Sequence, residues 1–196
     1  SRSARKFGVN VSRTLFKQII NELGGKLRLV ITGAAALAPD ICRDFEDFGI
    51  MVLQGYGMTE CTPLITGTPQ SASRTRYDKS GSVGVPVETG TVRIINPDEN
   101  GVGEILFKGP NVMLGYYNLP EATEEVLEDG WLRTGDIGYF DADGWLFLTG
   151  RAKNVIVTNA GENIYPEEIE DYINRHQYIS DSMVFASGES EDVVAV

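Results

Sequence analysis

A strand, a helix and a second strand follow one another within residues 26–53, and this pattern limits the fold more than any other feature. Residues 26–32 (KLRLVIT) alternate in polarity like a strand, and residues 50–53 form a short apolar run typical of a buried strand. Between them we expect a helix that is capped by Asp40 and ends at Gly49. Such units are almost always parallel and right-handed. The sequence therefore predicts a βαβ portion of an α/β sheet layer.

The two predicted strands lead into loops rich in small residues, which allow a ligand to approach the backbone. In open α/β sheets, ligands bind outside the carboxyl ends of the strands. The second loop, Gln54–Glu60, offers the Tyr56 ring for stacking on a base, the Thr59 hydroxyl for a phosphate oxygen and the Glu60 carboxylate for Mg²⁺. The alternatives are that the first loop, Gly33–Ala36, is simply a tight turn, that Tyr56 is a core tyrosine and that Glu60 is a solvated acid at a helix start.

The remaining chain predicts a mixed α+β fold with three parts. Residues 71–150 contain short β-type runs between turn clusters, namely Thr91–Asn96, Gly103–Lys108 and Trp145–Thr149, and one short helix after Pro120. This pattern is typical of a small antiparallel β-barrel or sandwich. After residue 150 we expect a strand, a helix beginning at Pro166 with Ile169, Tyr172 and Ile173 as its buried stripe, and two further strands. These would open a small α+β domain.

The predicted domain organisation follows from these changes in the pattern of predicted strands, turns and helices. Residues 1–150 are expected to be the C-terminal part of a large domain, with the βαβ portion in 1–70 and the β subdomain in 71–150. Residues 151–196 are expected to be the start of a small, mobile and incomplete C-terminal domain. The chain begins with Ser1 and ends within an apolar run, so the sequence predicts a fragment.

Composition excludes several classes of partner and site. The net charge of −11 over 196 residues argues against nucleic acid or an anionic membrane surface, but it leaves a nucleotide possible. No apolar run approaches eighteen residues, so no integral membrane segment is expected. Cys42 and Cys61 form no C-x-x-C pair, which favours reduced thiols and a cytoplasmic location, and the single His176 makes a histidine-based site improbable. These three residues receive no role. Lys79 is interpreted as part of a solvated loop, with contact to phosphates as the alternative.

Four further motifs occur in a fixed order along the chain. They are residues 103–118, with a Gly-Glu-Ile start and a Gly-Tyr-Tyr-Asn end, residues 131–136 (WLRTGD), residues 150–153 (GRAK) and residues 159–170 (NAGENIYPEEIE). Together with the Gln54–Glu60 loop they resemble the core motifs of the acyl-adenylate-forming superfamily, which includes acyl-CoA synthetases, luciferases and peptide-synthetase adenylation domains. The resemblance covers essentially the whole chain.

The resemblance implies roles for matching residues. The adenine is bound by the turn at residues 34–36, where Ala34 replaces the family's usual second glycine, and by Tyr56. Thr59 contacts the α-phosphate and Glu60 ligates Mg²⁺, which makes these two the predicted catalytic residues. The implied nucleotide- and cofactor-binding residues are Ala34, Ala35, Ala36, Gln54, Gly55, Tyr56, Gly57, Met58, Thr59, Asp136, Arg151, Gly161 and Asn163.

Residues after 130 take the remaining implied roles. Asp136 accepts hydrogen bonds from both ribose hydroxyls, and Arg151 holds the ribose and phosphate. Lys153 is the hinge about which the small domain turns between two reaction steps. The Gly161 loop lines the pantetheine route, with Asn163 near the nucleotide phosphate. The five residues Tyr56, Thr59, Glu60, Asp136 and Arg151 are expected to converge on one AMP-shaped hollow.

Two elements of this family have no match in the 196 residues. They are the Ser/Thr/Gly-rich phosphate loop ending in Lys-Gly and the catalytic lysine of the small domain, which is expected beyond Val196. Positioned positive charge is the main catalytic tool in such reactions. The isolated chain is therefore expected to be inactive.

The resemblance implies a parent enzyme that uses ATP, Mg²⁺ and CoA to convert a carboxylic acid into its thioester. Residues 31–66 and 151–170 look closest to bacterial long-chain fatty acyl-CoA synthetases. The alternatives are a shorter-chain or aryl acyl-CoA synthetase, an adenylation domain serving a carrier protein, and a non-catalytic nucleotide-binding module. The acyl chain length and the oligomeric state stay open.

Overall fold

The computed structural model describes residues 12–35, 37–71, 77–158, 162–187 and 193–196. Ala36 and Gly161, both named above as ligand-binding residues, lie outside this part of the chain. The chain forms two compact units. Unit 1 comprises Ser1–Thr91, Gly109–Leu114 and Asp141–Phe147, and unit 2 comprises Val92–Lys108, Gly115–Phe140 and Leu148–Val196.

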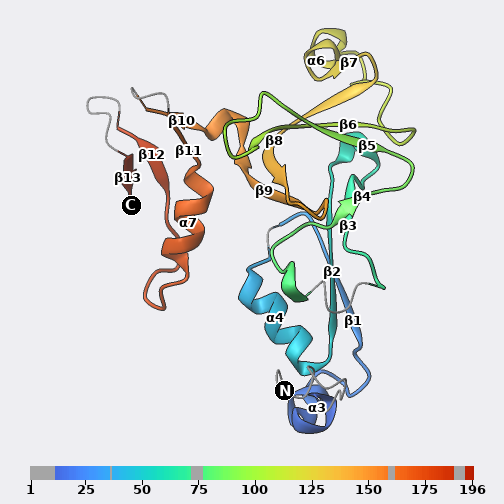
Figure 1. Cartoon of the computed structure of the whole chain (residues 1–196), viewed down its shortest axis with the longest axis vertical. Helices are drawn as coiled ribbons and strands as arrows, with labels where there is room; N and C mark the ends of the chain where they lie inside the picture. Colours follow the sequence, from blue (N-terminus) through green and yellow to red (C-terminus); the bar gives the residue numbers. More distant parts are fainter. Residues whose placement is uncertain (1–11, 36, 72–76, 159–161, 188–192) are drawn as a thin grey trace. The chain divides into compact units, whose positions relative to one another are not determined.

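Unit 1 is built on a four-stranded sheet of order β1-β2-β3-β4 (Figure 1). Strands β1 (Leu29–Thr32) and β2 (Met51–Tyr56) are parallel, and helix α4 (Pro39–Phe48) connects them. Strands β3 (Thr66–Gly67) and β4 (Val85–Pro86) extend the sheet in antiparallel fashion. The βαβ prediction is confirmed.

The two ends of helix α4 are determined by a proline and a glycine. It ends at Gly49, whose φ of 84° is the left-handed conformation that glycine adopts most easily. The prediction that Asp40 caps its start is wrong, because Ala38 is the N-cap and Pro39 opens the helix. Proline suits this position because its missing N–H would have no intrahelical partner there. Asp40 lies instead in the first turn.

The core of unit 1 surrounds strand β2. Ile50, Val52 and Ile65 are buried there, and the buried Glu46 of α4 accepts a hydrogen bond from the Val52 backbone N–H at 3.1 Å. Short helices of this unit include α2 (Ser12–Leu15), α3 (Lys17–Glu22) and the 3₁₀ turn η1 (Thr59–Cys61).

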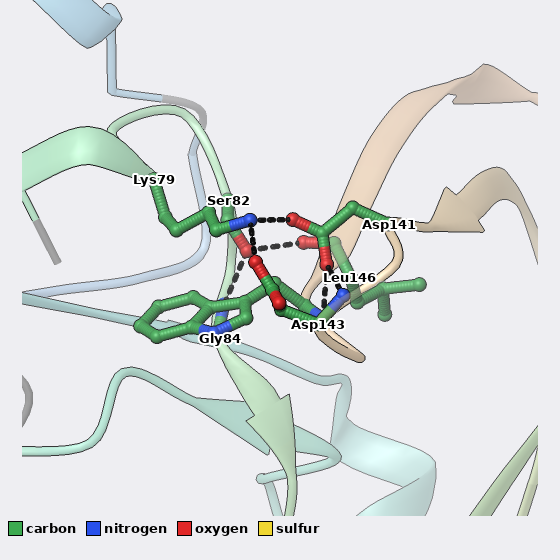
Figure 2. Close-up of polar contacts among 7 residues, drawn as sticks. Lys79, Ser82, Gly84, Asp141, Asp143 and Leu146 are labelled. Carbon is green, nitrogen blue, oxygen red and sulfur yellow. Dashed lines mark hydrogen bonds and ion pairs between the residues drawn. The ribbon is translucent and has the colours of Figure 1, made fainter. Parts of the chain in front are cut away.

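The turn after strand β8 (Trp131–Phe140) belongs to unit 1, where hydrogen bonds and ion pairs join it to the segment before β4. Lys79 Nζ lies 2.5 Å from both Asp141 Oδ2 and Asp143 Oδ2 (Figure 2). Ser82 Oγ donates to the Leu146 carbonyl at 2.6 Å, and Leu146 N–H donates to the Gly84 carbonyl at 2.8 Å. Lys79 is thus an ion-paired residue, and its interpretation as part of a solvated loop is wrong.

This cluster shifts the protonation of its members. The hydrogen bonds to Asp141 and Asp143 raise the pKa of Lys79. Burial raises the pKa of Asp141, but its hydrogen bonds from Lys79 and from the backbone N–H groups of Trp145 and Asp143 outweigh that effect, so the net pKa is lowered. Both charged forms are therefore favoured in the folded chain.

Unit 2 contains a five-stranded sheet in which β8 (Trp131–Phe140) is the longest strand. The order is β5 (Thr91–Ile95), β6 (Gly103–Lys108), β8, β7 (Leu127–Glu128), with β9 (Leu146–Arg151) also paired to β8. Strand β8 is antiparallel to both β6 and β7. Helix α6 (Pro120–Val126) precedes β7. The antiparallel β layer and the mixed α+β fold class are confirmed.

The last part of unit 2 begins with the 3₁₀ turn η2 (Ala152–Asn154). Two small antiparallel pairs follow, β10 (Ile156–Val157) with β11 (Asn163–Ile164), and β12 (Val184–Ala186) with β13 (Val193–Ala195). Helix α7 (Pro166–Asn174) lies between them in the sequence and contacts β12. Its predicted stripe is wrong at Tyr172, which is 77% exposed. The domain boundary at residue 150 stays a prediction.

Candidate functional site

The carboxyl ends of β1 and β2 meet at one edge of the unit 1 sheet. Thr32 pairs with Gln54 in the parallel register, so the loops that follow are neighbours. A Cβ atom on Gly33 would lie 3.1 Å from the Gly55 carbonyl oxygen, which shows how closely the two backbones approach. The sequence-predicted loops are therefore brought together by the fold.

The first loop presents backbone to solvent. Ala34 has a φ of 65°, a left-handed conformation that costs an L-residue roughly 1–2 kcal/mol. Ala34 and Ala35 are both exposed, and neither side chain extends past one carbon. The alanine at position 34 thus retains the conformation that a glycine would adopt, with little side chain to obstruct a ligand.

Strand β2 directs the first residues of the second loop inward. Gln54 is buried, and its Nε2 donates to the Ser82 carbonyl at 3.2 Å. Tyr56 is only 8% exposed, so it resembles the core tyrosine that the sequence left open. Its stacking role stays a prediction.

The turn after Tyr56 is held tightly. A Cβ atom on Gly57 would lie 1.8 Å from the Pro63 carbonyl oxygen, so this position accepts no side chain without movement of the backbone. The buried Cys61 Sγ accepts from Met58 N–H at 3.3 Å and donates to the Met58 carbonyl at 3.1 Å. Burial raises the pKa of Cys61, Met58 partly opposes this and the Glu60 charge adds to it, so the thiol keeps its donor proton. No role for Cys61 was predicted from the sequence, and its position beside Glu60 was the available signal.

Thr59 is exposed and Glu60 is half-buried at the start of η1. Among the residues that the structure describes, no group of three or more His, Cys, Asp or Glu side chains could hold a metal ion. Magnesium seldom uses an all-protein cage and is usually bound by one or two carboxylates together with substrate phosphates. The magnesium role of Glu60 stays a prediction.

In unit 2, two of the predicted site residues form an ion pair with each other. Arg151 Nε lies 2.8 Å from Asp136 Oδ1, with side-chain exposures of 54% and 12% respectively. Asp136 lies in β8, where its backbone N–H donates to Thr134 Oγ1 at 3.1 Å, and that hydroxyl donates to the Ile105 carbonyl at 2.8 Å. The sheet therefore orients the Asp136 backbone through Thr134.

The segment that contains the predicted hinge is tied to the first turn of α7. Lys153 is exposed within η2, and Asn163 is exposed in β11. Glu167 Oε1 accepts from Asn154 Nδ2 at 2.6 Å and from Arg151 N–H at 3.4 Å. From the sequence, Glu167 is expected only as an acid in the first turn of the helix that begins at Pro166, favourable to the helix dipole. Its contacts with Asn154 and Arg151 are not predicted by the sequence.

The structure thus forms two groups of predicted site residues. Ala34, Ala35 and the Gly55–Glu60 loop share the sheet edge of unit 1, and Asp136 pairs with Arg151 in unit 2. Their convergence on one nucleotide stays a prediction. No helix of the described residues has the length and apolar character needed to cross a membrane.

Comparison with known proteins gives consistent results. The model of the AMP-binding enzyme family matches residues 6–117. Long-chain-fatty-acid–CoA ligase of Yersinia pestis is 39% identical over 206 residues, covering 96% of this chain and 35% of that protein. Sulfoacetate–CoA ligase of Cupriavidus necator is 40% identical over 179 residues, covering 86% of this chain and 34% of that protein. The chain thus spans about a third of the length of these relatives.

Solved structures share the fold. O-succinylbenzoate coenzyme A synthetase (MenE) from Bacillus subtilis in complex with AMP superposes with a TM-score of 0.78 at 30% identity, over 93% of this chain and 39% of that one. The same enzyme in complex with ATP and magnesium gives 0.74 at 33% identity, over 86% and 35%. The family model alone covers more than half of the residues. On this evidence the chain belongs to the AMP-binding enzyme family.

Proposed function

We propose that this chain carries the AMP-holding part of an ATP-dependent acid–CoA ligase that forms an acyl-adenylate. The observation that carries the proposal is the shared edge of β1 and β2, where the exposed Ala34–Ala35 backbone adjoins the loop with Thr59 and Glu60. Parallel sheets bind ligands at this edge. MenE, which has the same fold, has been solved with AMP and with ATP and magnesium.

The proposed reaction has two steps. The acid's carboxylate oxygen attacks the α-phosphorus of ATP, which forms the acyl-adenylate and releases pyrophosphate. The sulfur of CoA then attacks the acyl carbon, which releases AMP and leaves the thioester. Glu60 would hold Mg²⁺ against the phosphates, Thr59 would donate to an α-phosphate oxygen and Asp136 would accept from the ribose hydroxyls.

We propose a fatty acid as the acid substrate. The support is the 39% identity to the long-chain ligase of Yersinia pestis over nearly the whole chain. A small acid is the second candidate, because the sulfoacetate–CoA ligase of Cupriavidus necator is equally similar. CoA as the acceptor is supported by both relatives' names. The Gly161 loop remains the proposed lining of its pantetheine route, and Asn163 remains the proposed neighbour of the nucleotide phosphate.

The first test is calorimetric titration of the 196-residue chain with AMP, with GMP as the control nucleotide. We expect saturable binding of AMP and at least tenfold weaker binding of GMP, because an adenine site rejects a base whose polar edge is left unpaired. Equal affinities for AMP and GMP would contradict an adenylate site.

The second test is ATP–pyrophosphate exchange with palmitate, acetate, sulfoacetate and ferulate. The 196-residue chain should show no exchange, because none of its residues matches the family's phosphate loop. The product of the complete reading frame should exchange, with palmitate as the best acid. Faster exchange with sulfoacetate would replace the fatty-acid proposal by the small-acid one.

A further inference from the structure

Residues 109–114 form a short segment of unit 1 that is hydrogen-bonded to the turn at residues 60–64. Met113 N–H donates to the Glu60 carbonyl at 2.7 Å. Asn111 Nδ2 donates to two carbonyls of the same turn, those of Cys61 and of Leu64, the latter at 3.0 Å. Three hydrogen bonds thus join this segment to residues 60–64.

The chemistry of the Asn111 side chain matches this task. Both of its partners are carbonyl oxygens, which only accept, so only the amino end of the amide can face them. That end carries two N–H donors, one for each carbonyl. The other end, Oδ1, is buried without a hydrogen-bond partner among the described residues. An unpaired buried acceptor is unfavourable, so the two donated bonds must compensate for it.

The turn that Asn111 holds is otherwise constrained at its opposite end. Cys61 Sγ closes it onto Met58, and Gly57 lies directly against the Pro63 carbonyl. Thr62 adopts a φ of 45°, which lets the chain reverse between the two carbonyls that Asn111 binds. Without the two Asn111 bonds, only the Met113 N–H bond to the Glu60 carbonyl would join residues 109–114 to this turn, among the hydrogen bonds described above.

We infer that Asn111 is a positioning residue for Thr59 and Glu60, which act on the phosphates and their magnesium ion. The inference rests on the proposed function, because it assigns these two residues to the nucleotide's phosphate end. Asn111 itself touches no ligand in this account. It donates to the carbonyls of Cys61 and Leu64, which follow Glu60 in the chain. Met58, which precedes Glu60, is bonded to Cys61 Sγ, so the backbone is fixed on both sides of Glu60.

The test compares two ligands on one variant. In Asn111→Asp the amide's two donors become a carboxylate that faces two carbonyl oxygens, so the turn should lose its fixed position. We expect the Kd for Mg-ATP to rise about tenfold, the size of effect that a lost pair of hydrogen bonds produces. The Kd for adenosine, which has no phosphate, should stay within about twofold. Both are measured by calorimetry on the 196-residue chain.

Asn21→Asp is the matched control, because it makes the same chemical change at an exposed position on α3 and should alter neither affinity. Asn111→Ser, which keeps one donor, should show a smaller selective loss and serves if the aspartate variant fails to fold. Equal losses for adenosine and Mg-ATP would show a merely structural role, and unchanged affinities would show no role; either result overturns the inference. If the unmutated chain binds neither ligand, the proposed function itself fails and the inference falls with it.

Discussion

Arg151 Nε lies 2.8 Å from Asp136 Oδ1. The partners lie fifteen positions apart in the sequence, on the paired strands β8 and β9. Arg151 is half-exposed, and exposed ion pairs contribute roughly 0–1 kcal/mol to stability. The pair therefore adds little to stability by itself, and the ligand roles of both residues stay predictions that binding measurements can test.

The first prediction concerns the ribose role of Asp136. Replacing it by alanine should weaken AMP binding by about tenfold to a hundredfold, because hydrogen bonds to charged groups contribute about 1.5–3 kcal/mol each. A second titration with 2′-deoxy-AMP, which lacks one ribose hydroxyl, measures how much that hydroxyl contributes to the affinity. The unmutated chain should prefer AMP, and Asp136→Ala should lose that preference.

Asp171→Ala supplies the control, because Asp171 is an exposed residue of α7 that pairs with Arg175 and has no proposed ligand role. It should bind AMP as the unmutated chain does. If Asp136→Ala still distinguishes AMP from its deoxy analogue, the ribose hydroxyls have another acceptor.

The second prediction concerns the Lys79 cluster and pH. Asp141 has a lowered pKa in the folded chain, so its stabilising effect is present above its ordinary value of 3.8 and is lost as pH falls through the lowered value. Lys79 has a raised pKa, so its effect is present below its ordinary 10.5 and is lost as pH rises beyond the raised value. The cluster therefore stabilises the chain between these limits.

Lys79→Met should lower the melting temperature by a few degrees at pH 7, and the difference from the unmutated chain should shrink below about pH 3.8. Thermal melts followed by circular dichroism between pH 3 and 9 measure this. Lys17→Met, at an exposed position of α3, should show no such pH-dependent difference. A difference that stays constant into acid would mean that Lys79 acts through packing and not through its charge.

The third prediction concerns Gly57. An added methyl would overlap the Pro63 carbonyl oxygen at 1.8 Å, and overpacking of this kind costs about 1–3 kcal/mol or more. Gly57→Ala should therefore reduce the free energy of unfolding in urea and weaken Mg-ATP binding.

Gly101→Ala is the comparison, because Gly101 has a φ of 80° and no atom within 4 Å of the added carbon. It should cost only the left-handed strain, about 1 kcal/mol, and leave Mg-ATP binding unchanged. Equal losses of stability would show that the Gly57 turn relaxes easily.

The sequence predicted the local elements well because their signals are local. The apolar residues of 26–53 and the glycine after α4 are enough to define a βαβ unit, and Gly103–Lys108 matches β6 residue for residue. Asp40 was mistaken for a cap because Pro39, whose geometry is preset for a first helical position, took the start of the helix.

Tyr172 shows why periodicity alone cannot assign a helix face. Glu170 of α7 accepts a hydrogen bond from Val184 N–H of β12 at 2.7 Å, so the Glu170 side faces that strand. Residues two apart on a helix point about 200° apart. Tyr172 is therefore directed away from β12, and a single long-range hydrogen bond decided its exposure.

The contacts that the sequence did not predict join residues far apart in the chain. Asn111 and Cys61 are 50 residues apart, and Lys79 and Asp141 are 62 apart. No spacing rule connects such residues, because their contact arises only when separate segments of unit 1 assemble. The Thr59–Glu60 loop was recognisable because its chemical groups are contiguous.

The chain passes between the two units five times, after residues 91, 108, 114, 140 and 147. During synthesis, unit 1 therefore lacks its last segment until Phe147 has left the ribosome, by which time strands β5, β6, β7 and β8 of unit 2 have been synthesised. A protease that cuts one crossing would not release either unit, and no single stretch of the gene encodes unit 1 alone.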